Sequence, residues 1–249
     1  MKALLGPEGR AELRRLARAR SLLAFDFDGT LAPIVPRPDV AAMRSSTRTL
    51  LAAVAARWPC AVISGRRLSD LRPRFEGIPV RWLVGNHGAE GGAPVPGAAR
   101  LRREVSEWRD RLRAGMDGRP GIRVEDKGMA VAVHFRDSPH RAAARARILE
   151  LAGTFEDARL VPGKCVVDVL PAEAPDKGSA LAHLVRIARP ERAFFAGDDA
   201  SDEDAFAREL PVPLTTVRVG GGRATRARFG LAGQGAVDRM LRALLAASD

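Results

Sequence analysis

The sequence predicts an α/β fold in which a parallel sheet with crossover helices is interrupted by a smaller α+β insert. Strand-length apolar runs occur at residues 22–27, 60–64, 80–84 and 193–197, and helical patterns separate the first two pairs of runs. This alternation is typical of parallel strands joined by crossover helices. Between the third run and the fourth the pattern changes to short strands interspersed with helices, which predicts the insert.

The N-terminal segment and the two cysteines have structural interpretations. Residues 8–20 are rich in arginine and loosely amphipathic, which predicts a short surface helix. An organellar targeting peptide is the alternative, but Glu8 and Glu12 are unusual in that acid-poor class. Cys60 and Cys165 lie in apolar runs without metal-ligand spacing, so we expect both to be reduced thiols in the core.

The insert is expected to contain two helices and several strands. A helical pattern runs to Arg113, and residues 121–135 predict two strands around a tight turn at 126–128. Ser138 and Pro139 predict the capped start of a helix that ends near residue 152, and residues 158–171 are again strand-like. The predicted division of the chain is into residues 1–95, 96–171 and 172–249, with the first and last segments forming one domain.

The composition indicates a globular protein. The chain has 249 residues, 46% of them hydrophobic, and no apolar run approaches the ~20 residues of a membrane helix. With no secretory signal at the N-terminus, we expect a cytoplasmic protein without membrane contact, and we favour a monomer. The net charge of +11 raises nucleic acid as a partner, but the arginines are scattered and only 5% of residues are aromatic, so no stacking platform is expected. We therefore expect no nucleic-acid partner, and a basic environment would also favour a small phosphorylated substrate.

Two aspartates lie at the end of the first apolar run, in the segment SLLAFDFDGTLAP. Asp26 and Asp28 are two residues apart on extended chain, so their side chains project to the same face, while Gly29 permits a turn and Thr30 offers a hydroxyl and an amide. Two carboxylates this close repel each other unless a cation or a shared proton intervenes. One could bind metal and act as a nucleophile while the other carries a proton to a leaving oxygen. An ordinary Asp-Gly turn is the alternative.

A second acidic cluster, in FFAGDDASDEDAF, follows the last apolar run. Asp198 and Asp202 are spaced to share one face as a helix begins. Helix capping accounts for one or two acids here, but not for all of those at 198, 199, 202, 203 and 204. Because the carboxyl ends of parallel strands meet at one edge of a sheet, we expect the two clusters to form an all-oxygen site suited to magnesium.

Two further motifs offer groups that could hold a phosphate. Ser64 and Gly65 end the second strand with free amides and a hydroxyl at a predicted helix N-terminus. Lys177 follows Asp176 at the start of another helix, from which its ammonium could reach phosphate oxygens. Ser64 as an ordinary helix cap and Lys177 as a solvated helix residue are the alternatives, but the joint occurrence of four motifs at strand ends favours phosphate chemistry.

Together these motifs resemble those of a known superfamily. DFDGTL, ISGR, DKG and GDDASDEDAF, in this order, are similar to the four motifs of the haloacid-dehalogenase superfamily of phosphatases. The surrounding segments DFDGTLAPIVPRP, VISGRRLSDL, GNHGAE and KGMAVAVHFR narrow the resemblance to the trehalose-6-phosphate phosphatases, and it extends from residue 22 to about residue 206. The resemblance implies a Rossmann-like parallel-sheet core and identifies the insert as an α+β cap domain of the C2 type, which closes over the sugar.

The resemblance also implies an activity and a role for each motif residue. The reaction would be magnesium-dependent hydrolysis of trehalose 6-phosphate to trehalose and phosphate through an aspartyl phosphate, with Asp26 as nucleophile and Asp28 as proton carrier. The implied magnesium ligands are Asp26, the backbone carbonyl of Asp28, Asp198 and, in a supporting role, Asp202. The implied phosphate-binding residues are Thr30, Ser64, Gly65 and Lys177, of which the last is also catalytic. The expected substrate-binding residues are Arg66, Asn86, His87, Lys127, His134, Arg136 and Asp168. A purely structural role is the alternative for His87.

The cap departs from the family pattern at one place. The family usually has Glu-x-Arg-Pro where this chain has Asp168, Val169, Leu170 and Pro171. A shorter acid can still reach a sugar hydroxyl through a small shift or a water, but the missing arginine removes several donors. Another sugar phosphate, such as sucrose phosphate or mannosylglycerate phosphate, is therefore the alternative substrate. A catalytically idle binder of sugar phosphate or nucleic acid is a further alternative.

Overall fold

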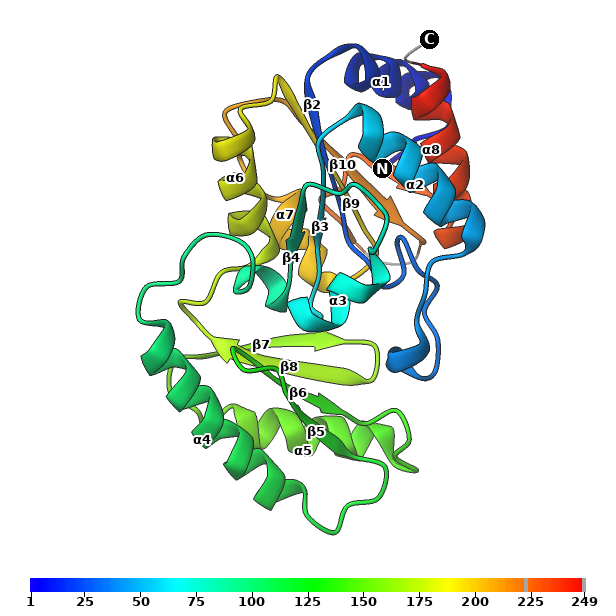
Figure 1. Ribbon diagram of the computed structural model, residues 1–249. Coiled ribbons are helices and arrows are strands. Elements are labelled where there is room, and N and C mark those ends of the chain that lie inside the picture. The colour runs from blue at the N-terminus through cyan, green and yellow to red at the C-terminus, as the bar shows by residue number, and fades with distance from the viewer. Residues whose placement is uncertain (222–223, 248–249) are drawn as a thin grey trace. The chain divides into compact units, whose positions relative to one another are not determined.

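The chain forms two compact units in a computed structural model that describes residues 1–221 and 224–247. The first unit comprises Met1–Ala93 and Asp176–Asp249, and the second comprises Pro94–Pro175 (Figure 1). The units begin and end close to the predicted domain boundaries, and the independence of these domains stays a prediction. None of the helices in the described residues is long and apolar enough to cross a membrane.

A seven-stranded sheet forms the centre of the first unit. Its order is β1-β11-β10-β9-β2-β3-β4, and its neighbouring strands all pair in parallel. Its strands are β1 (Lys2–Ala3), β2 (Ser21–Phe25), β3 (Cys60–Ile63), β4 (Trp82–Val84), β9 (Arg192–Gly197), β10 (Leu214–Val219) and β11 (Phe229–Leu231). The predicted parallel α/β fold is therefore confirmed, and the four apolar runs correspond to β2, β3, β4 and β9.

Strands β1, β10 and β11 carry no clear signal in the sequence and were not predicted. The first of these strands has two residues and the last has three, so neither carries a periodic signal. In β10 the polar residues Thr215, Thr216 and Arg218 interrupt the apolar pattern, yet all three are buried. Their polar groups have partners: Thr215 donates to Glu12 at 2.9 Å, and Arg218 donates to the carbonyl of Asp199 at 2.9 Å.

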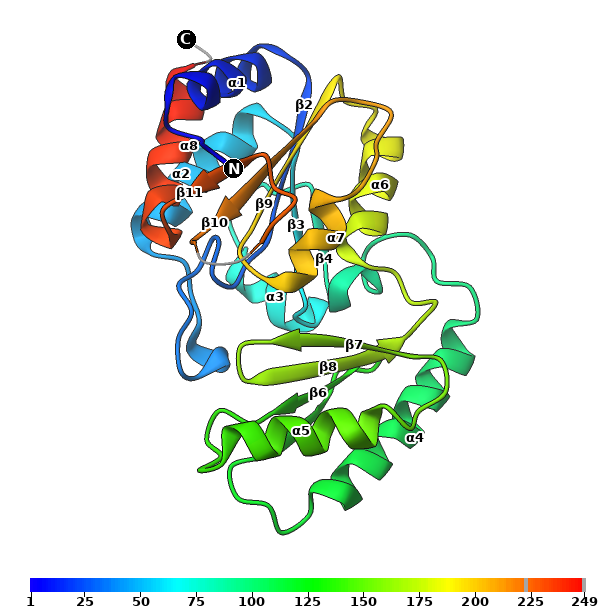
Figure 2. The ribbon, with the colours of Figure 1, turned by 180° about the vertical axis from the view of Figure 1, so that it is seen from behind.

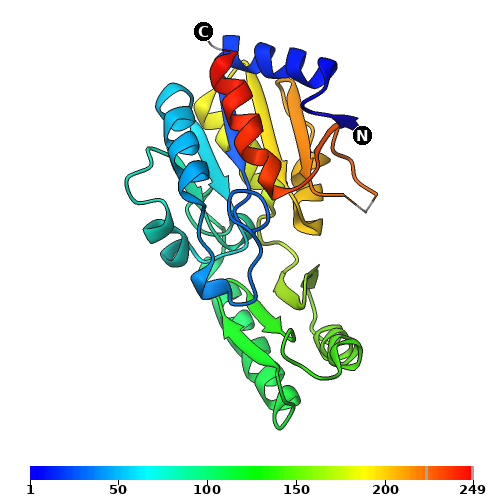
Figure 3. The ribbon, with the colours of Figure 1, turned by 90° about the vertical axis from the view of Figure 1, so that its right-hand side faces the viewer.

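Helices cover both faces of this sheet (Figures 1 and 2). The helices on one face are α1 (Pro7–Arg18), α2 (Ser45–Arg57) and α8 (Val237–Ala246), and α3 (Leu68–Arg74) borders the same core. The helices on the other face are α6 (Lys177–Ala188) and α7 (Glu203–Phe206). The unit also contains short 3₁₀ helices, namely η1 (Pro38–Val40), η2 (Asn86–Gly88), η3 (Ala200–Asp202) and η4 (Gln234–Ala236). Figure 3 looks onto α8, beside which α1 and α2 lie.

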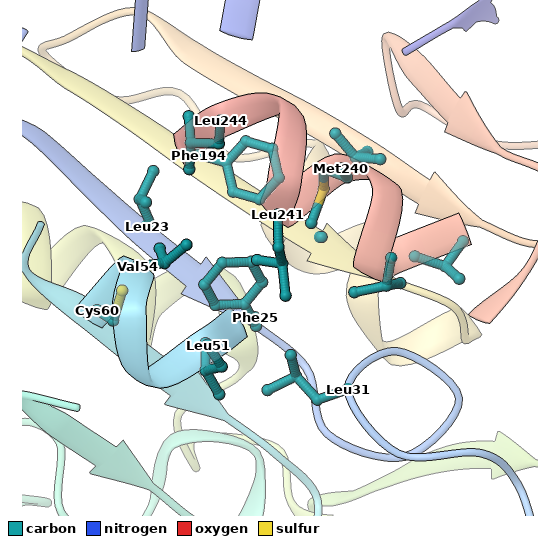
Figure 4. Packing of buried hydrophobic residues seen from close by; sticks show 14 of the residues in the cluster. Leu23, Phe25, Leu31, Leu51, Val54, Cys60, Phe194, Met240, Leu241 and Leu244 are labelled. Carbon is teal, nitrogen blue, oxygen red and sulfur yellow. The ribbon is translucent and has the colours of Figure 1, made fainter. Parts of the chain in front are cut away.

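Strand β2 contributes apolar side chains to both cores. Leu23 and Phe25 point into the core under α2 and α8, whereas Leu22 and Ala24 belong to the core under α6. Figure 4 shows Phe25 and Phe194 among the leucine side chains of α2 and α8, and the two rings lie 5.6 Å apart between centroids. A strand that is apolar on both faces is what a central parallel strand requires. This packing fixes the end of β2, where Asp26 follows.

The arginine-rich N-terminal segment forms the predicted short helix, α1, with its arginines on the exposed face and the other face packed on the core. Leu13 and Leu16 are buried in the core, and Glu12 is 2% exposed. Glu12 accepts hydrogen bonds from Arg15 and Thr215 at 2.9 Å and from Arg192 at 3.0 Å. Burial alone would raise the pKa of Glu12, but these partners hold it below its ordinary value.

The order of the strands brings β2 and β9 side by side at a reversal of the sheet. The chain runs outward from β2 through β3 to β4 and then returns to the other side of β2 with β9. Ligands bind parallel sheets at the carboxyl ends of the strands beside such a reversal. The amide of Asp26 donates to the carbonyl of Ala196 at 2.8 Å, so the loops that follow β2 and β9 start next to each other.

The second unit has a four-stranded antiparallel sheet with two helices on one face. The strands are β5 (Arg123–Asp126), β6 (Val131–His134), β7 (Ala158–Gly163) and β8 (Val166–Pro171), in the order β5-β6-β8-β7. The helices are α4 (Ala98–Met116) and α5 (Arg141–Ala152). Trp108 of α4 stacks on Phe155 with 5.7 Å between ring centroids, beside the inward valines of β6 and β8. The α+β insert and its turn at 126–128 agree with the prediction.

Two details of the insert differ from the prediction. Helix α5 begins at Arg141 rather than beside Ser138, because the Ser138 hydroxyl accepts from the amide of His140 and closes a turn ahead of the helix. The strand-like stretch 158–171 is a hairpin, and Cys165 lies in its turn at φ 60°, half-buried, so the expected core thiol is wrong there. Cys60 is a free, buried cysteine of β3, and burial raises the pKa of its thiol to about 12.

Candidate active site

A buried lysine joins two aspartates from different strand ends. Asp26 follows β2, Asp202 ends η3 after β9, and Lys177 is the first residue of α6. The ammonium of Lys177 donates to Oδ1 of Asp26 and to Oδ1 of Asp202, each at 2.7 Å. The side chains of Lys177, Asp26 and Asp202 are 3%, 6% and 0% exposed, so this charged group is enclosed by protein.

The start of α6 fixes the position of Lys177. The Asp176 carboxylate accepts from the amide of Ser179 at 2.6 Å, and the Ser179 hydroxyl accepts from the amide of Asp176 at 2.9 Å, which makes a reciprocal capping box. A Cβ on Gly178 would lie 2.3 Å from the carbonyl oxygen of Asp204, so only glycine allows α6 to approach α7 this closely. The motif DKGS thus fixes the start of α6, the helix that carries Lys177.

Burial and like charges perturb the titration of this cluster. Burial raises the pKa of Asp26 well above its ordinary value, Lys177 opposes this shift, and the carboxylates of Asp202 and Asp198 add to it. Burial also disfavours the ammonium of Lys177, but Asp202 and Asp26 outweigh that effect and raise its pKa. A further cation among these carboxylates would relieve their mutual repulsion.

Three carboxylates are grouped closely enough to hold a metal ion. Asp26, Asp198 and Asp202 are all buried, and each offers an oxygen within 4.8 Å of the others. Gly29 has φ 82°, and a Cβ there would lie 2.1 Å from Oδ2 of Asp198, so glycine lets this carboxylate meet the loop after β2. An all-oxygen donor set fits a hard divalent cation such as Mg²⁺. The structure therefore brings the two acidic segments together.

Asp28 is turned toward Arg66 instead of joining this cluster. Nε of Arg66 donates to Oδ2 of Asp28 at 2.6 Å, and Nη2 donates to Oδ1 at 2.7 Å. The two bonds form the paired geometry that arginine makes with carboxylates. A role of the backbone carbonyl of Asp28 as a metal ligand stays a prediction.

Ser64 and Gly65 lie in a loop, and the expectation that they form a helix N-terminus is wrong. Helix α3 begins at Leu68, whose amide donates to Oε2 of Glu90 at 2.6 Å. The amide of Ser64 is also not free, because it donates to the carbonyl of Val84 at 2.9 Å and so continues the β3–β4 pairing. This capping role of Glu90 in GNHGAE was not predictable from the sequence, because nothing local links residue 90 to residue 68.

Asn86 and His87 contact the loop that contains Ser64 and Gly65. Both have positive φ, at 48° and 56°, which is uncommon for residues other than glycine. The amide of Asn86 donates to the carbonyl of Arg66 at 2.7 Å, and the amide of His87 donates to the carbonyl of Ser64 at 2.9 Å. A Cβ on Gly65 would lie 2.7 Å from two atoms of the His87 ring. These contacts favour the structural role for His87, and substrate contact by either residue stays a prediction.

Thr30 carries a buried hydroxyl in the loop after β2. The residue is 0% exposed, and its Oγ1 has no hydrogen-bond partner among the residues that the structure describes. A buried hydroxyl without a partner is costly, so such groups commonly meet a ligand or an ordered water. The hydroxyl fits an oxygen-rich ligand.

A separate group of charged residues lies on the sheet of the second unit, on the face away from its helices. Lys127 donates to Oδ1 of Asp168 at 2.7 Å, with both side chains nearly buried. Nε2 of His134 lies 2.7 Å from Oε2 of Glu125, and this bond holds the pKa of Glu125 below its ordinary value against the effect of burial. Sequence reasoning missed Glu125, although it lies two residues before Lys127 and the alternation of the strand could have indicated it.

Arg136 and Leu170 are placed differently from these pairs. Arg136 lies beyond the end of β6 and donates to the carbonyl of Lys164 at 3.3 Å, in the turn between β7 and β8. Leu170 is 0% exposed and packs with Ala130 and Ala174 in a small apolar cluster. The apolar residue at this position therefore contributes to packing.

Comparisons with known proteins agree with this architecture. The family model described as trehalose-phosphatase matches residues 24–219. The trehalose-phosphate phosphatase of Mycobacterium ulcerans (strain Agy99) is 33% identical over 250 residues, an alignment that covers 93% of this chain and 61% of that relative. This chain thus spans less than two thirds of the length of the curated relatives that it matches.

Solved structures show the same fold. The C-terminal domain of C. albicans trehalose-6-phosphate phosphatase superimposes with a TM-score of 0.82 at 24% identity, and the match covers 98% of each chain. A haloacid dehalogenase-like hydrolase from B. subtilis superimposes with a TM-score of 0.57 at 15% identity, over 89% of this chain and 98% of that one. These similarities confirm the haloacid-dehalogenase fold. Because the family model matches well over half of the sequence, this chain belongs to the trehalose-phosphatase family.

Proposed function

We propose that this protein is a magnesium-dependent phosphomonoesterase that hydrolyses trehalose 6-phosphate to trehalose and phosphate. The observation that carries the proposal is the buried cluster of Asp26, Asp198, Asp202 and Lys177 at the carboxyl ends of β2 and β9. Carboxylates and an ammonium around one point suit a site that both attacks and neutralises a phosphate. Membership of the trehalose-phosphatase family supports the choice of substrate.

Asp26 is the proposed nucleophile. A carboxylate oxygen attacks phosphorus as the bond to the sugar oxygen breaks, which leaves an aspartyl phosphate and free trehalose. Water then attacks the phosphorus, phosphate departs and the carboxylate of Asp26 is restored. Its bond to Lys177 fixes one oxygen of the carboxylate, and burial of the pair at 6% and 3% exposure keeps bulk water away from the attacking group.

Four residues are proposed to hold the phosphate oxygens, namely Thr30, Ser64, Gly65 and Lys177. The strongest argument concerns Thr30, because its buried hydroxyl has no partner among the described residues and a phosphate oxygen would supply one. Lys177 contributes a full positive charge, which opposes the negative charge of a loose phosphoryl transition state.

The cluster of Asp26, Asp198 and Asp202 would hold the magnesium ion, with the backbone carbonyl of Asp28 as a further ligand. When bound, Mg²⁺ would neutralise charge on the phosphate and orient it for in-line attack. The fit rests on the three buried oxygens within 4.8 Å of one another and on the absence of a Cβ at Gly29.

Asp28 is the proposed proton carrier. It would donate a proton to the departing sugar oxygen and later accept one from the attacking water, so that it starts each cycle in the same state. The sugar itself would be recognised by polar groups of the second unit, among which Lys127, Asp168 and His134 are the strongest candidates. Sugar hydroxyls suit these charged groups, because a hydroxyl both donates and accepts hydrogen bonds.

A phosphate-release assay tests this function. The purified chain is assayed with Mg²⁺ and with EDTA on trehalose 6-phosphate, sucrose 6-phosphate and mannosylglycerate phosphate. We expect kcat/KM to be highest for trehalose 6-phosphate by at least about tenfold, and activity to disappear with EDTA. Another sugar phosphate as the best substrate would replace the proposed substrate, and no release from any of them would overturn the function.

Matched variants complete this assay. Asp26→Asn should abolish release while the thermal unfolding midpoint shows a folded protein, and Asp117→Asn, a change of the same kind at an exposed position, should leave release unchanged. Retained activity in Asp26→Asn would exclude Asp26 as the nucleophile.

A further inference from the structure

The guanidinium of Arg66 is almost fully occupied by groups of the first unit. Besides its two bonds to Asp28, Nη1 donates to Oδ2 of Asp70 at 2.6 Å and Nη2 donates to the carbonyl of Pro38 at 2.8 Å. An arginine side chain has about five N–H donors, and these bonds use four of them. Its Cζ also lies 5.3 Å from the centre of the Phe27 ring. The side chain is 11% exposed, low for an arginine, so it is held in one orientation.

A second set of contacts holds Asp70, one of the partners of the Arg66 guanidinium. Arg66, Asp70 and Arg74 follow one another at four-residue steps, and Nη1 of Arg74 lies 2.7 Å from Oδ1 of Asp70. Arg74 also donates to the carbonyls of Ala41 and Asp39, at 3.2 Å and 2.9 Å. The helix α3 and the loop that contains η1 are thereby joined to the guanidinium.

The main chain of Arg66 is fixed as well. Its amide donates to the hydroxyl of Ser64 at 3.2 Å, and its carbonyl accepts from the amide of Asn86 at 2.7 Å. The backbone and the side chain of Arg66 are therefore both tied to the loops that surround the end of β2.

Asp28, in contrast, is only partly buried. Its side chain is 38% exposed, and an aspartate that exposed can change rotamer readily. Paired bonds from a rigid guanidinium select one orientation of both carboxylate oxygens. The proton carrier of the proposed reaction thus depends on Arg66 for its direction.

We propose that Arg66 is a positioning residue that orients the carboxyl group of Asp28 for proton transfer. This inference rests on the proposed function, and it replaces the expectation that Arg66 binds the substrate directly. In the first step the bond between phosphorus and the sugar oxygen breaks as the bond to Asp26 forms, and the proton of Asp28 passes to the sugar oxygen. In the second step Asp28 takes a proton from the water that attacks phosphorus.

A double-mutant cycle on two substrates tests this role. The variants Arg66→Ala, Asp28→Ala and the combination of both are assayed on trehalose 6-phosphate and on p-nitrophenyl phosphate, whose leaving group departs without a proton. We expect Arg66→Ala to lower kcat/KM about 10- to 100-fold on the sugar phosphate and less than about threefold on the aryl phosphate. In the Asp28→Ala background, loss of Arg66 should cost no more than about a further twofold, because Arg66 acts through Asp28.

Two results would overturn the inference. Additive losses in the double variant would mean that Arg66 contacts the substrate independently, and equal losses on both substrates would indicate a general structural role. Exposed Arg67 supplies the matched control, since Arg67→Ala removes the same charge one residue away and should leave both rates unchanged.

Two further controls distinguish the role of Arg66 from a loss of folding and from a failure of the proposed function. If Arg66→Ala does not fold, Arg66→Lys keeps the charge without the paired geometry and should show the same dependence on the leaving group, at a thermal midpoint near that of the wild type. If the wild-type chain releases no phosphate from any sugar phosphate, the proposed function itself fails. An active wild type with an additive cycle rejects the role of Arg66 alone.

Discussion

The ammonium of Lys177 lies 2.7 Å from Oδ1 of Asp26, although 151 positions of sequence separate the two residues. The insert lies between them in the chain, and α6, which follows the insert, brings Lys177 back beside Asp26. Because Lys177 also bonds Asp202, one buried cation joins the loops after β2 and β9. We therefore expect the stability of the first unit and the chemistry of the proposed site to depend on the same residue.

Loss of this lysine should reduce both stability and activity. Lys177→Met leaves Asp26 and Asp202 buried beside each other without the ammonium, which we expect to cost about 3–5 kcal/mol of unfolding free energy at pH 7. Mg²⁺ should restore part of this loss, because a bound cation opposes the same repulsion. Urea denaturation with Mg²⁺ and with EDTA measures both effects. Lys164→Met, at an exposed position, is the control, and an equal loss in the two variants would contradict the account.

Magnesium should bind the first unit in the absence of substrate. Binding to the native state raises unfolding free energy by about 2.7 kcal/mol when the ion is at about a hundred times its dissociation constant. We expect thermal unfolding of the wild type to shift upward with Mg²⁺, and Asp198→Asn to need at least about tenfold more Mg²⁺ for the same shift. A wild-type midpoint that does not respond to Mg²⁺ would argue against the site.

Alanine substitutions at two glycines test whether the close approach of Asp198 to the loop after β2 matters. Gly29 and Gly118 have φ of 82° and 67°, but a Cβ would lie 2.1 Å from Asp198 at the first position, whereas at the second no atom of the described residues lies within 4 Å of it. We expect Gly118→Ala to cost only the strain of its backbone, about 1–2 kcal/mol. Gly29→Ala should cost more and should also weaken Mg²⁺ binding. Equal costs with unchanged Mg²⁺ binding would show that the close approach is unimportant.

The buried Glu12 should contribute to the unfolding free energy at neutral pH, and this contribution should be lost in acid. Burial raises the pKa of Glu12, but Arg15, Thr215 and Arg192 outweigh it and hold the pKa below the ordinary 4.5. The ionised form therefore stabilises the fold above pH 4.5, and this contribution is lost as the pH falls through the lower folded-state value. Glu12→Gln should cost about 1–3 kcal/mol at pH 7 and less in acid, as measured by denaturant titrations across this range. Exposed Glu8→Gln is the control, and a cost that does not vary with pH would refute the linkage.

The sequence predicts the principal parts of the site well, for a physical reason. Asp26 and Asp198 each follow an uninterrupted apolar run, and parallel strands that are buried on both faces direct such residues to one edge of the sheet. Lys177 is similarly marked by the capping residues Asp176 and Ser179. These signals are local, so they can be found without knowledge of the tertiary structure.

Features that depend on the path of loops were not predictable in this way. The pairing of Arg66 with Asp28 spans 38 positions, and nothing in either motif indicates it. The start of α3 depends on Glu90, and the burial of Thr215 in β10 depends on Glu12 of α1. In each case a polar group is satisfied by a distant partner, which sequence periodicity does not report.

The configuration at phosphorus tests the central claim, that Asp26 forms a covalent intermediate, most directly. A trehalose 6-thiophosphate made chiral with oxygen isotopes is hydrolysed by the wild-type protein in isotopically labelled water, and the configuration of the released thiophosphate is measured by NMR. Each in-line displacement inverts phosphorus, so two successive displacements through Asp26 predict overall retention. Inversion would mean that water attacks the substrate directly, and it would contradict the role of Asp26 as the nucleophile.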